Sequence, residues 1–187
     1  MDHYLDLRLR PDPELPQHQL MDELFARLHR ALVHGSRTDI GMSFPDARQG
    51  LRGRLGGRLR LHGTLAALVR LDSTSWLVGM RDHVEATGVL VVPENVGAIS
   101  VRRVQAKSNV DRLRRRQMKR KGWTAAEAAA AIPATAAESL DLPFLTVRSL
   151  STGQTFRLFL RQQAASAATS GVFNGYGLSA EATLPHF

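Results

Sequence analysis

Residues 3–33 read HYLDLRLRPDPELPQHQLMDELFARLHRALV and contain the two patterns that decide the fold. In residues 3–10 leucine alternates with polar residues, which predicts a half-buried strand. Three prolines follow and end that strand. Over residues 17–33 the apolar residues recur at helical spacing, and Gly35 ends the predicted helix. The chain is therefore expected to open with a strand that leads into an amphipathic helix.

The same kind of pattern extends outward over the first half of the chain. Strands are expected near residues 40–44 and 58–62, a helix over 64–71 and a further strand over 84–92. The resulting order, β-α-β-β-α-β, is that of a ferredoxin-like domain, which we place at residues 1–95. That fold serves many functions, so it does not by itself indicate one.

The second half, residues 96–187, is predicted to be a second domain, which makes the fold class α+β. A basic helix is expected over about 108–121, and Thr124 with Glu127 forms a capping box for a short helix after it. A hairpin is expected around residues 151–153. The strands of this domain are predicted at 99–107, 144–150, 154–162 and 172–178.

The composition is that of an ordinary globular protein, with 43% hydrophobic and 22% charged residues. The absence of cysteine excludes disulfides, thiolate metal ligands and a cysteine nucleophile. No apolar run approaches the roughly 20 residues that span a bilayer. The first residues also lack the pattern of a signal peptide. We therefore expect a cytoplasmic protein that does not bind membranes.

The positive charge is concentrated in one segment of the chain. The net charge is +8, yet residues 102–121 alone carry +9 and the remainder is close to neutral. Of the 25 basic residues, 22 are arginine, whose planar guanidinium pairs with phosphate and with guanine. This pattern favours a polyanionic partner, nucleic acid first of all. The alternative is a solvated basic helix that only aids solubility, a purpose that lysine would serve equally well.

The predicted basic helix lacks an apolar face. Five of its basic residues fall within an arc of about 140° at 100° per residue: Arg112, Arg115, Arg116, Lys119 and Arg120. Its two apolar residues, Leu113 and Met118, lie on opposite flanks, so no stripe about 100° wide is available for burial. We expect the helix to protrude from the domain and to bind phosphate groups. The helix residues assigned to these contacts are Arg112, Arg115, Arg116, Lys119, Arg120 and Lys121.

Four segments along the chain form a set that points to a known family. They are MDHYLD at 1–6, RVQAKSN at 103–109 before the basic helix, RSLSTGQTFRLF at 148–159 and YGLS at 176–179. Together they resemble the CRISPR repeat-processing endoribonucleases of the type I-F (Csy) systems, in the family's order and spacing. The family's fold, a ferredoxin-like domain followed by a domain with an arginine-rich helix, agrees with the elements expected above.

The resemblance implies an activity without metal or cofactor. The enzyme would cut precursor CRISPR RNA at the base of each repeat hairpin, where the ribose 2′-hydroxyl attacks the adjacent phosphate. The products would carry a 2′,3′-cyclic phosphate and a 5′-hydroxyl. The resemblance also implies that His29 transfers the proton, Ser149 positions the ribose and Tyr176 orients the histidine. From the residues alone, His29 would be read as structural, Ser149 as a turn residue and Tyr176 as part of the core.

Two residues two apart on a predicted strand, Arg103 and Gln105, are candidates for reading bases because they share one face. Arginine matches guanine and glutamine matches adenine, although a merely polar strand face is the alternative. The resemblance implies that they contact purines at the foot of the stem and that Phe156, otherwise a core residue, stacks on the terminal base pair. The remaining residues assigned to phosphate or groove contacts are Arg102, Lys107, Ser151 and Thr152.

The partners implied by the resemblance are the repeat hairpin, as precursor and as product, and the other subunits of a type I-F surveillance complex. A metal site has little support, because the sequence contains no HExxH motif and no carboxylate cluster. The alternative function is that of a non-catalytic RNA-binding or scaffold protein. Such a protein would not need His29, Ser149 and Tyr176.

Overall fold

The structure is a computed structural model, and it describes residues 1–48, 53–105, 110–133, 140–149 and 152–187. The chain divides into two compact units, one made of residues 1–104 and 142–187, the other of residues 105–141. The predicted domain boundary at residue 95 stays a prediction, since the first unit contains both of the sheets described below.

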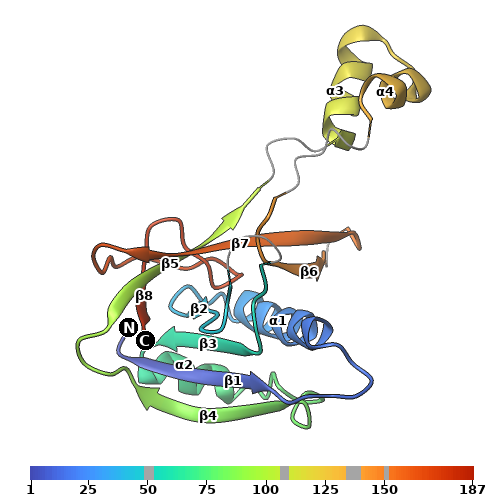
Figure 1. Cartoon of the computed structure of the whole chain (residues 1–187). Helices are drawn as coiled ribbons and strands as arrows, with labels where there is room; N and C mark the ends of the chain where they lie inside the picture. The colour runs from blue at the N-terminus through green and yellow to red at the C-terminus, as the bar shows by residue number, and fades with distance from the viewer. Residues whose placement is uncertain (49–52, 106–109, 134–139, 150–151) are drawn as a thin grey trace. The chain divides into compact units, whose positions relative to one another are not determined.

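The first sheet is antiparallel with strand order β2-β3-β1-β4 and carries two helices (Figure 1). Its elements are β1 (His3–Leu9), α1 (Gln17–His34), β2 (Gly41–Ser43), β3 (Arg58–Gly63), α2 (Leu65–Asp72) and β4 (Val84–Val91). The chain order is β-α-β-β-α-β, so the predicted arrangement of the first half is confirmed. Apolar burial explains it: the leucines of β1 and the apolar stripe of α1 lie in one core.

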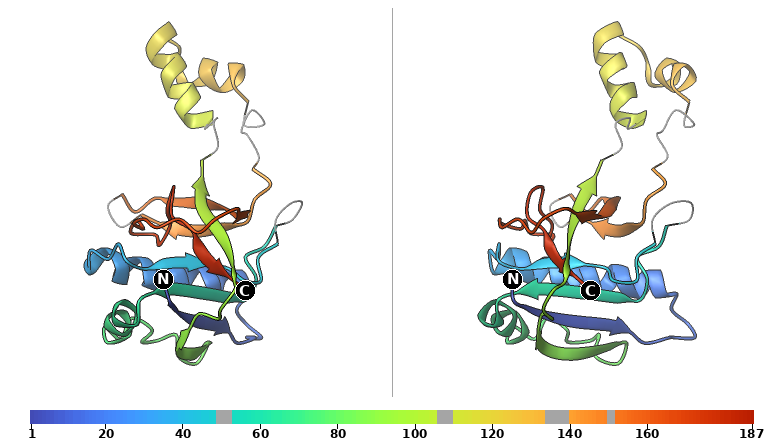
Figure 2. Two further views of the ribbon diagram at one scale, coloured as in Figure 1. Left: turned by 90° about the vertical axis from the view of Figure 1, so that its left-hand side faces the viewer. Right: turned by 60° about the vertical axis from the view of Figure 1, so that its left-hand side comes forward.

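The second sheet is also antiparallel and has strand order β6-β7-β5-β8. Its strands are β5 (Gly97–Val104), β6 (Phe144–Arg148), β7 (Thr155–Ala165) and β8 (Leu184–His186). The two sheets form separate layers of the first unit (Figure 2). Helix α1 belongs to both, because its Asp22 side chain accepts a hydrogen bond of 2.8 Å from the backbone N–H of Thr146 on β6. The α+β class is therefore confirmed.

Two predicted strands of the second half differ from the structure. The last strand was predicted over residues 172–178, but this segment contains a turn and no strand. The last strand of the chain is β8. The reason is local: Asn174 and Gly177 close a tight turn in which the Gly177 N–H donates to the Asn174 carbonyl at 2.8 Å. The strand predicted over 99–107 ends at Val104, so Gln105 lies just beyond it.

The second unit holds two helices, α3 (Val110–Lys121) and α4 (Ala125–Ala131). The capping box of Thr124 and Glu127 is confirmed. Gly122, with φ of +68°, ends α3 in a left-handed conformation that glycine adopts without strain. The basic helix is thus confirmed from residue 110 onward, whereas residues 108 and 109 lie outside the described ranges. Its predicted protrusion from the rest of the protein stays a prediction.

The middle of the polar face of the first sheet is buried, although the alternation in β1 leads one to expect that it faces water. Asp6 and Arg60 stand opposite each other on β1 and β3 and are only 7% and 4% exposed. The Arg60 guanidinium donates two hydrogen bonds to the Asp6 carboxylate, at 2.6 and 2.8 Å. It is also stacked between the rings of Tyr4 and Phe187, 4.6 and 3.9 Å from their centres. The C-terminal segment therefore covers this ion pair.

His62 lies on the same face and gives the fold a pH dependence. It is fully buried, its Nε2 is 2.8 Å from the Ser43 hydroxyl oxygen, and burial beside Arg60 lowers its pKa to about 3. The unfolded chain binds a proton here below about pH 6.5, whereas the folded chain does not until about pH 3. We therefore expect this residue to lower the free energy of unfolding by about 1.4 kcal/mol per pH unit as the pH falls between these values.

Urea denaturation of the wild type and of His62→Gln from pH 7 to pH 4 measures this slope. The difference in the free energy of unfolding between the two proteins should change steadily with pH, because glutamine does not titrate. His34→Gln, which replaces an exposed histidine, should keep the wild-type pH dependence. If the difference in unfolding free energy between wild type and His62→Gln is the same at every pH from 7 to 4, the prediction is wrong.

Candidate active site

His29 projects from α1 toward the turn of residues 174–178, which comes from the other end of the chain. The ring is half-buried, and its Nδ1 lies 2.7 Å from the Gly175 carbonyl oxygen. Because a carbonyl oxygen only accepts, Nδ1 carries the proton and donates it, and Nε2 of the neutral ring keeps its lone pair. This hydrogen bond thus selects the tautomer whose Nε2 can take up a proton.

Tyr176 stacks on this histidine. The two ring centres are 4.4 Å apart and the rings are nearly parallel, with an angle of 11°. Phe25, one helical turn before His29, lies 6.2 Å from the histidine ring and 6.3 Å from the tyrosine ring. The structure therefore brings together two of the three predicted catalytic residues and holds the imidazole by one hydrogen bond and by ring contacts. Their roles in catalysis stay predictions.

The turn that holds Tyr176 is built by residues that sequence reasoning missed. The Asn174 side-chain oxygen accepts the backbone N–H groups of Tyr176 and Leu178, at 2.9 and 3.3 Å. The Gly177 carbonyl accepts the N–H of Met42 at 2.9 Å, which ties the turn to β2. Asparagine and two glycines within four residues are a turn signal, and it could have been read from the sequence.

Gly175 brings its carbonyl close to α1 because it has no side chain. A Cβ at this position would lie only 2.8 Å from Val33 Cγ2, a methyl of a short branched side chain. We expect Gly175→Ala to push the turn away from α1 and to weaken the bond that orients His29. Misplacement by about 1 Å can cost up to about 100-fold in rate, so the cleavage that the resemblance implies is expected to slow by roughly 10- to 100-fold.

Single-turnover cleavage of a repeat hairpin, the substrate that the resemblance implies, measures this effect. Gly97→Ala is the matched control, because a Cβ at Gly97 would lie 3.7 Å from the nearest atom, which is an ordinary contact. It should cut at the wild-type rate. A Gly175→Ala protein as fast as the wild type would show that the carbonyl does not position the histidine.

Ser149, the third predicted catalytic residue, lies in a different element, the hairpin between β6 and β7. Its N–H donates to the Gln154 carbonyl at 2.8 Å, and its hydroxyl oxygen accepts the N–H of Thr152 at 3.3 Å. Leu145 and Val147 on β6 point into the core, whereas Ser149 lies just beyond the end of β6 at Arg148. The hydroxyl of Ser149 thus stabilises its own turn.

Two residues predicted to recognise bases come together on the face of the second sheet that carries Leu158 and Leu160. The Arg103 guanidinium lies over the Phe156 ring, 5.6 Å from its centre. Arg103 stands opposite Leu160 on β7, and Phe156 shares the face of Leu158 and Leu160. Gln105 is exposed but lies outside β5, so strand geometry does not place it beside Arg103. Its role stays a prediction.

The described basic side chains of α3 are exposed from Arg115 onward, whereas Arg114 is half-buried and has a structural function. Arg114 donates a hydrogen bond of 2.9 Å to the Ile132 carbonyl and so ties α3 to the end of α4. Lys121 lies 4.5 Å from the centre of the Trp123 ring. The exposed members are Arg115, Arg116, Lys119, Arg120 and Lys121.

The other residues predicted to contact RNA phosphates are either exposed or outside what the structure describes. Arg102 on β5 and Thr152 in the hairpin are exposed. Lys107 and Ser151 lie outside the described residues, as does the side chain of Arg112. Within the described ranges, no group of three or more His, Asp or Glu side chains could hold a metal ion. None of the described helices combines the length and the apolar composition that a membrane span requires.

Comparison with known proteins gives matches over the whole chain. A family model described as CRISPR-associated protein (Cas_Csy4) matches residues 4–187. The chain is 51% identical to the CRISPR-associated endonuclease Cas6/Csy4 of Pseudomonas aeruginosa (strain UCBPP-PA14) over 188 residues, all of both chains. It is 47% identical to the protein of the same name from Escherichia coli (strain UTI89 / UPEC) over 189 residues, again all of both chains. The similarity thus covers every segment that contributes a site residue.

Proposed function

The chain belongs to the Cas_Csy4 family of CRISPR-associated proteins, and from this premise we propose that it cuts precursor CRISPR RNA at the base of the repeat hairpin. The observation that carries the proposal is the oriented imidazole of His29, whose Nδ1–H is bound to the Gly175 carbonyl and whose ring stacks on Tyr176. A protein that only bound RNA would not need a histidine in a fixed tautomer.

The proposed reaction uses the ribose 2′-hydroxyl as its nucleophile and needs no metal ion. His29 Nε2 takes the proton of this hydroxyl while the 2′-oxygen forms a bond to the adjacent phosphorus. The bond from phosphorus to the 5′-oxygen breaks, and this oxygen receives a proton from water. One product then ends in a 2′,3′-cyclic phosphate and the other begins with a 5′-hydroxyl. Ser149 would position the ribose and Tyr176 the imidazole.

Recognition of the hairpin is divided between two regions in this proposal. Arg103 and Gln105 would contact purines at the foot of the stem, and Phe156 would stack on the last base pair. The exposed basic side chains of α3, together with Arg102, Lys107, Arg112, Ser151 and Thr152, would bind phosphates. We further propose that the protein acts in the cytoplasm, keeps its cut RNA and joins a type I-F surveillance complex.

The decisive experiment is cleavage of a repeat hairpin in the presence of EDTA, followed by analysis of the product ends. The expected products are the cyclic phosphate and the 5′-hydroxyl, formed at the same rate with and without EDTA. A hairpin with 2′-deoxyribose at the cleavage position should be bound but not cut. Cleavage of this second RNA would indicate attack by water and would overturn the proposed mechanism.

The proposed division of RNA binding between α3 and Arg103 leads to a separate prediction. Arg116→Ala together with Arg120→Ala should weaken all hairpins alike and reduce the log–log salt slope by roughly 0.7 to 0.9 per lost phosphate contact. Arg103→Ala should instead remove a preference of about 1–3 kcal/mol for guanine at the stem base. Titrations of matched and mismatched hairpins at several salt concentrations measure both effects. Loss of sequence preference in the α3 variant, with an unchanged salt slope, would mean that the two assignments are reversed.

A further inference from the structure

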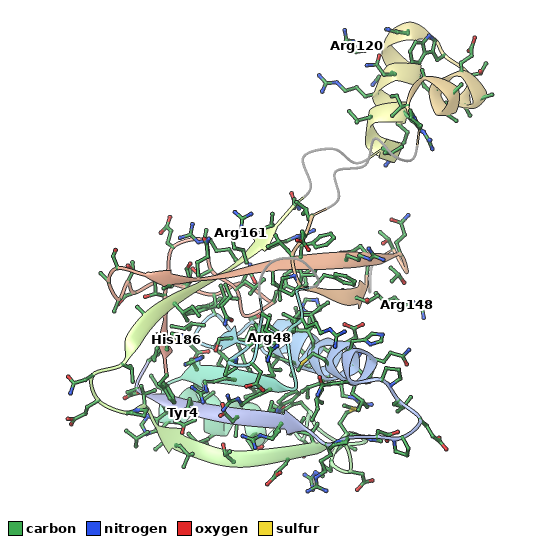
Figure 3. All side chains as sticks on the ribbon, viewed as in Figure 1. Tyr4, Arg48, Arg120, Arg148, Arg161 and His186 are labelled. Atoms are coloured by element: carbon green, nitrogen blue, oxygen red, sulfur yellow. The ribbon has the colours of Figure 1, made fainter. Side chains whose placement is uncertain are left out.

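The second sheet has an arginine-rich face of which the proposed function uses only one residue, Arg102 at its edge on β5. In β6 and β7 the residues Leu145, Val147, Leu158 and Leu160 point into the core, so their neighbours point to the opposite face. This opposite face, which we name the outer arginine face, is exposed. Its charged residues are Arg102 on β5, Arg148 on β6 and Arg157 and Arg161 on β7 (Figure 3 labels Arg148 and Arg161).

The charges of this face are uncompensated within the sheet. Arg102 and Arg161 stand directly opposite each other on neighbouring strands, an arrangement that is unfavourable for like charges. None of the four arginines makes an ion pair with an acid in the described part of the chain. No position of this face on β5, β6 or β7 is acidic. A polyanion bound here would offset the repulsion.

Two aromatic rings lie among these arginines. Phe144 and Phe159 face each other across β6 and β7, with ring centres 5.5 Å apart, and Phe144 is 38% exposed. The Arg157 guanidinium lies over the Phe144 ring, 4.5 Å from its centre. Guanidinium planes and aromatic rings on an open sheet are the surfaces on which unpaired bases stack. The face therefore combines rings on which the bases of a single strand can stack with arginines that can bind the phosphates of its backbone.

We infer that the outer arginine face binds single-stranded RNA that flanks the repeat hairpin, without reading its sequence. This inference rests on the proposed function, because only a protein that holds the hairpin receives these flanking strands. From Arg157 to Arg161 the face extends about 13 Å along β7 at roughly 3.3 Å per residue, so two arginines on one strand can reach successive parts of the RNA backbone. Arginine, and not lysine, at all four positions favours RNA over a merely soluble surface.

The test compares the wild type with Arg157→Ala/Arg161→Ala on three RNAs. All contain 2′-deoxyribose at the cleavage position; one is the hairpin alone, and the others add a single-stranded extension at the 5′ or the 3′ end. We expect an extension on at least one side to tighten wild-type binding by about fivefold or more. The variant should lose this gain and show a salt slope lower by roughly 0.7 per lost contact on that RNA. Both proteins should bind the hairpin alone within twofold.

Arg10→Ala/Arg81→Ala is the matched control, because it removes two exposed arginines from another part of the first unit. It should keep the full gain from the extension. If no extension tightens wild-type binding, or if the variant retains the gain, the inference is wrong and an acidic protein surface becomes the alternative occupant. Weaker binding of the hairpin alone by the variant would also overturn it, because Arg157 and Arg161 would then contact the stem. Cleavage of the all-ribose hairpin in the same series tests the proposed function separately.

Discussion

His29→Ala is expected to reduce the cleavage rate by at least about 100-fold, the lower end of what a positioned acid or base contributes. The reason is the removal of the Nε2 lone pair, which the Gly175 carbonyl keeps available by binding the other ring nitrogen. Binding of the hairpin should change by no more than a few-fold, because the described contacts of the imidazole are with Gly175, Tyr176 and Phe25. Single-turnover cleavage and equilibrium titration of the same hairpin measure the two quantities.

His34→Ala is the matched control for this experiment. It removes an exposed histidine from the last turn of the same helix and should leave the cleavage rate unchanged. A His29→Ala protein that cuts at the wild-type rate would exclude this residue from proton transfer. Equal losses of binding and cleavage would instead indicate that the histidine holds the RNA.

Arg60→Met is expected to cost about 3–5 kcal/mol of unfolding free energy, the usual loss when one partner of a buried ion pair is removed. Methionine keeps much of the volume between the Tyr4 and Phe187 rings but removes both hydrogen bonds of the buried Asp6 carboxylate. The Arg58 guanidinium, 3.6 Å away, is then the charged partner that remains to it. Chemical denaturation at neutral pH measures the loss.

The exposed pair of Arg70 and Asp39 provides the comparison. Its N–O distance of 2.6 Å equals the shorter contact in the buried pair, but both side chains are about half exposed. Arg70→Met should cost less than about 1 kcal/mol. Similar losses for the two variants would mean that burial does not set the strength of the pair. Adding Asp6→Leu to Arg60→Met should recover part of the stability, since the buried carboxylate that lost its two hydrogen bonds is then absent.

The elements of the first half could be predicted because each carries its own periodic pattern and buries one face. Residues 172–178 could not be read in this way, since Val172, Phe173 and Tyr176 suggest a strand while the asparagine and glycines among them fold the segment into a turn. The burial of Asp6 could not be predicted from the sequence either. Alternation in β1 identifies two faces, but it does not indicate that the C-terminal segment covers the polar one.

The candidate site was predictable only in part from the residues themselves. The charge of residues 102–121 indicated a polyanion, whereas nothing near His29 in sequence distinguishes it from a structural histidine. Its partner, Gly175, is 146 positions away, and a contact over this distance is set by tertiary packing and not by local pattern. The resemblance to a family supplied His29 and Tyr176 as a pair, and the structure then gave the distance between their rings.

Helix α1 has a consequence for how the protein loses activity on heating. Its apolar stripe packs in the shared core, its Asp22 fastens the edge of the second sheet, and its His29 is the proposed base. Melting of either sheet would remove the support of this one helix, so the two layers should behave as a single cooperative unit. Thermal inactivation and loss of secondary structure should then share one midpoint, with no folded but inactive species between them. A change that raises the thermal stability of the fold should therefore raise the temperature of inactivation as well.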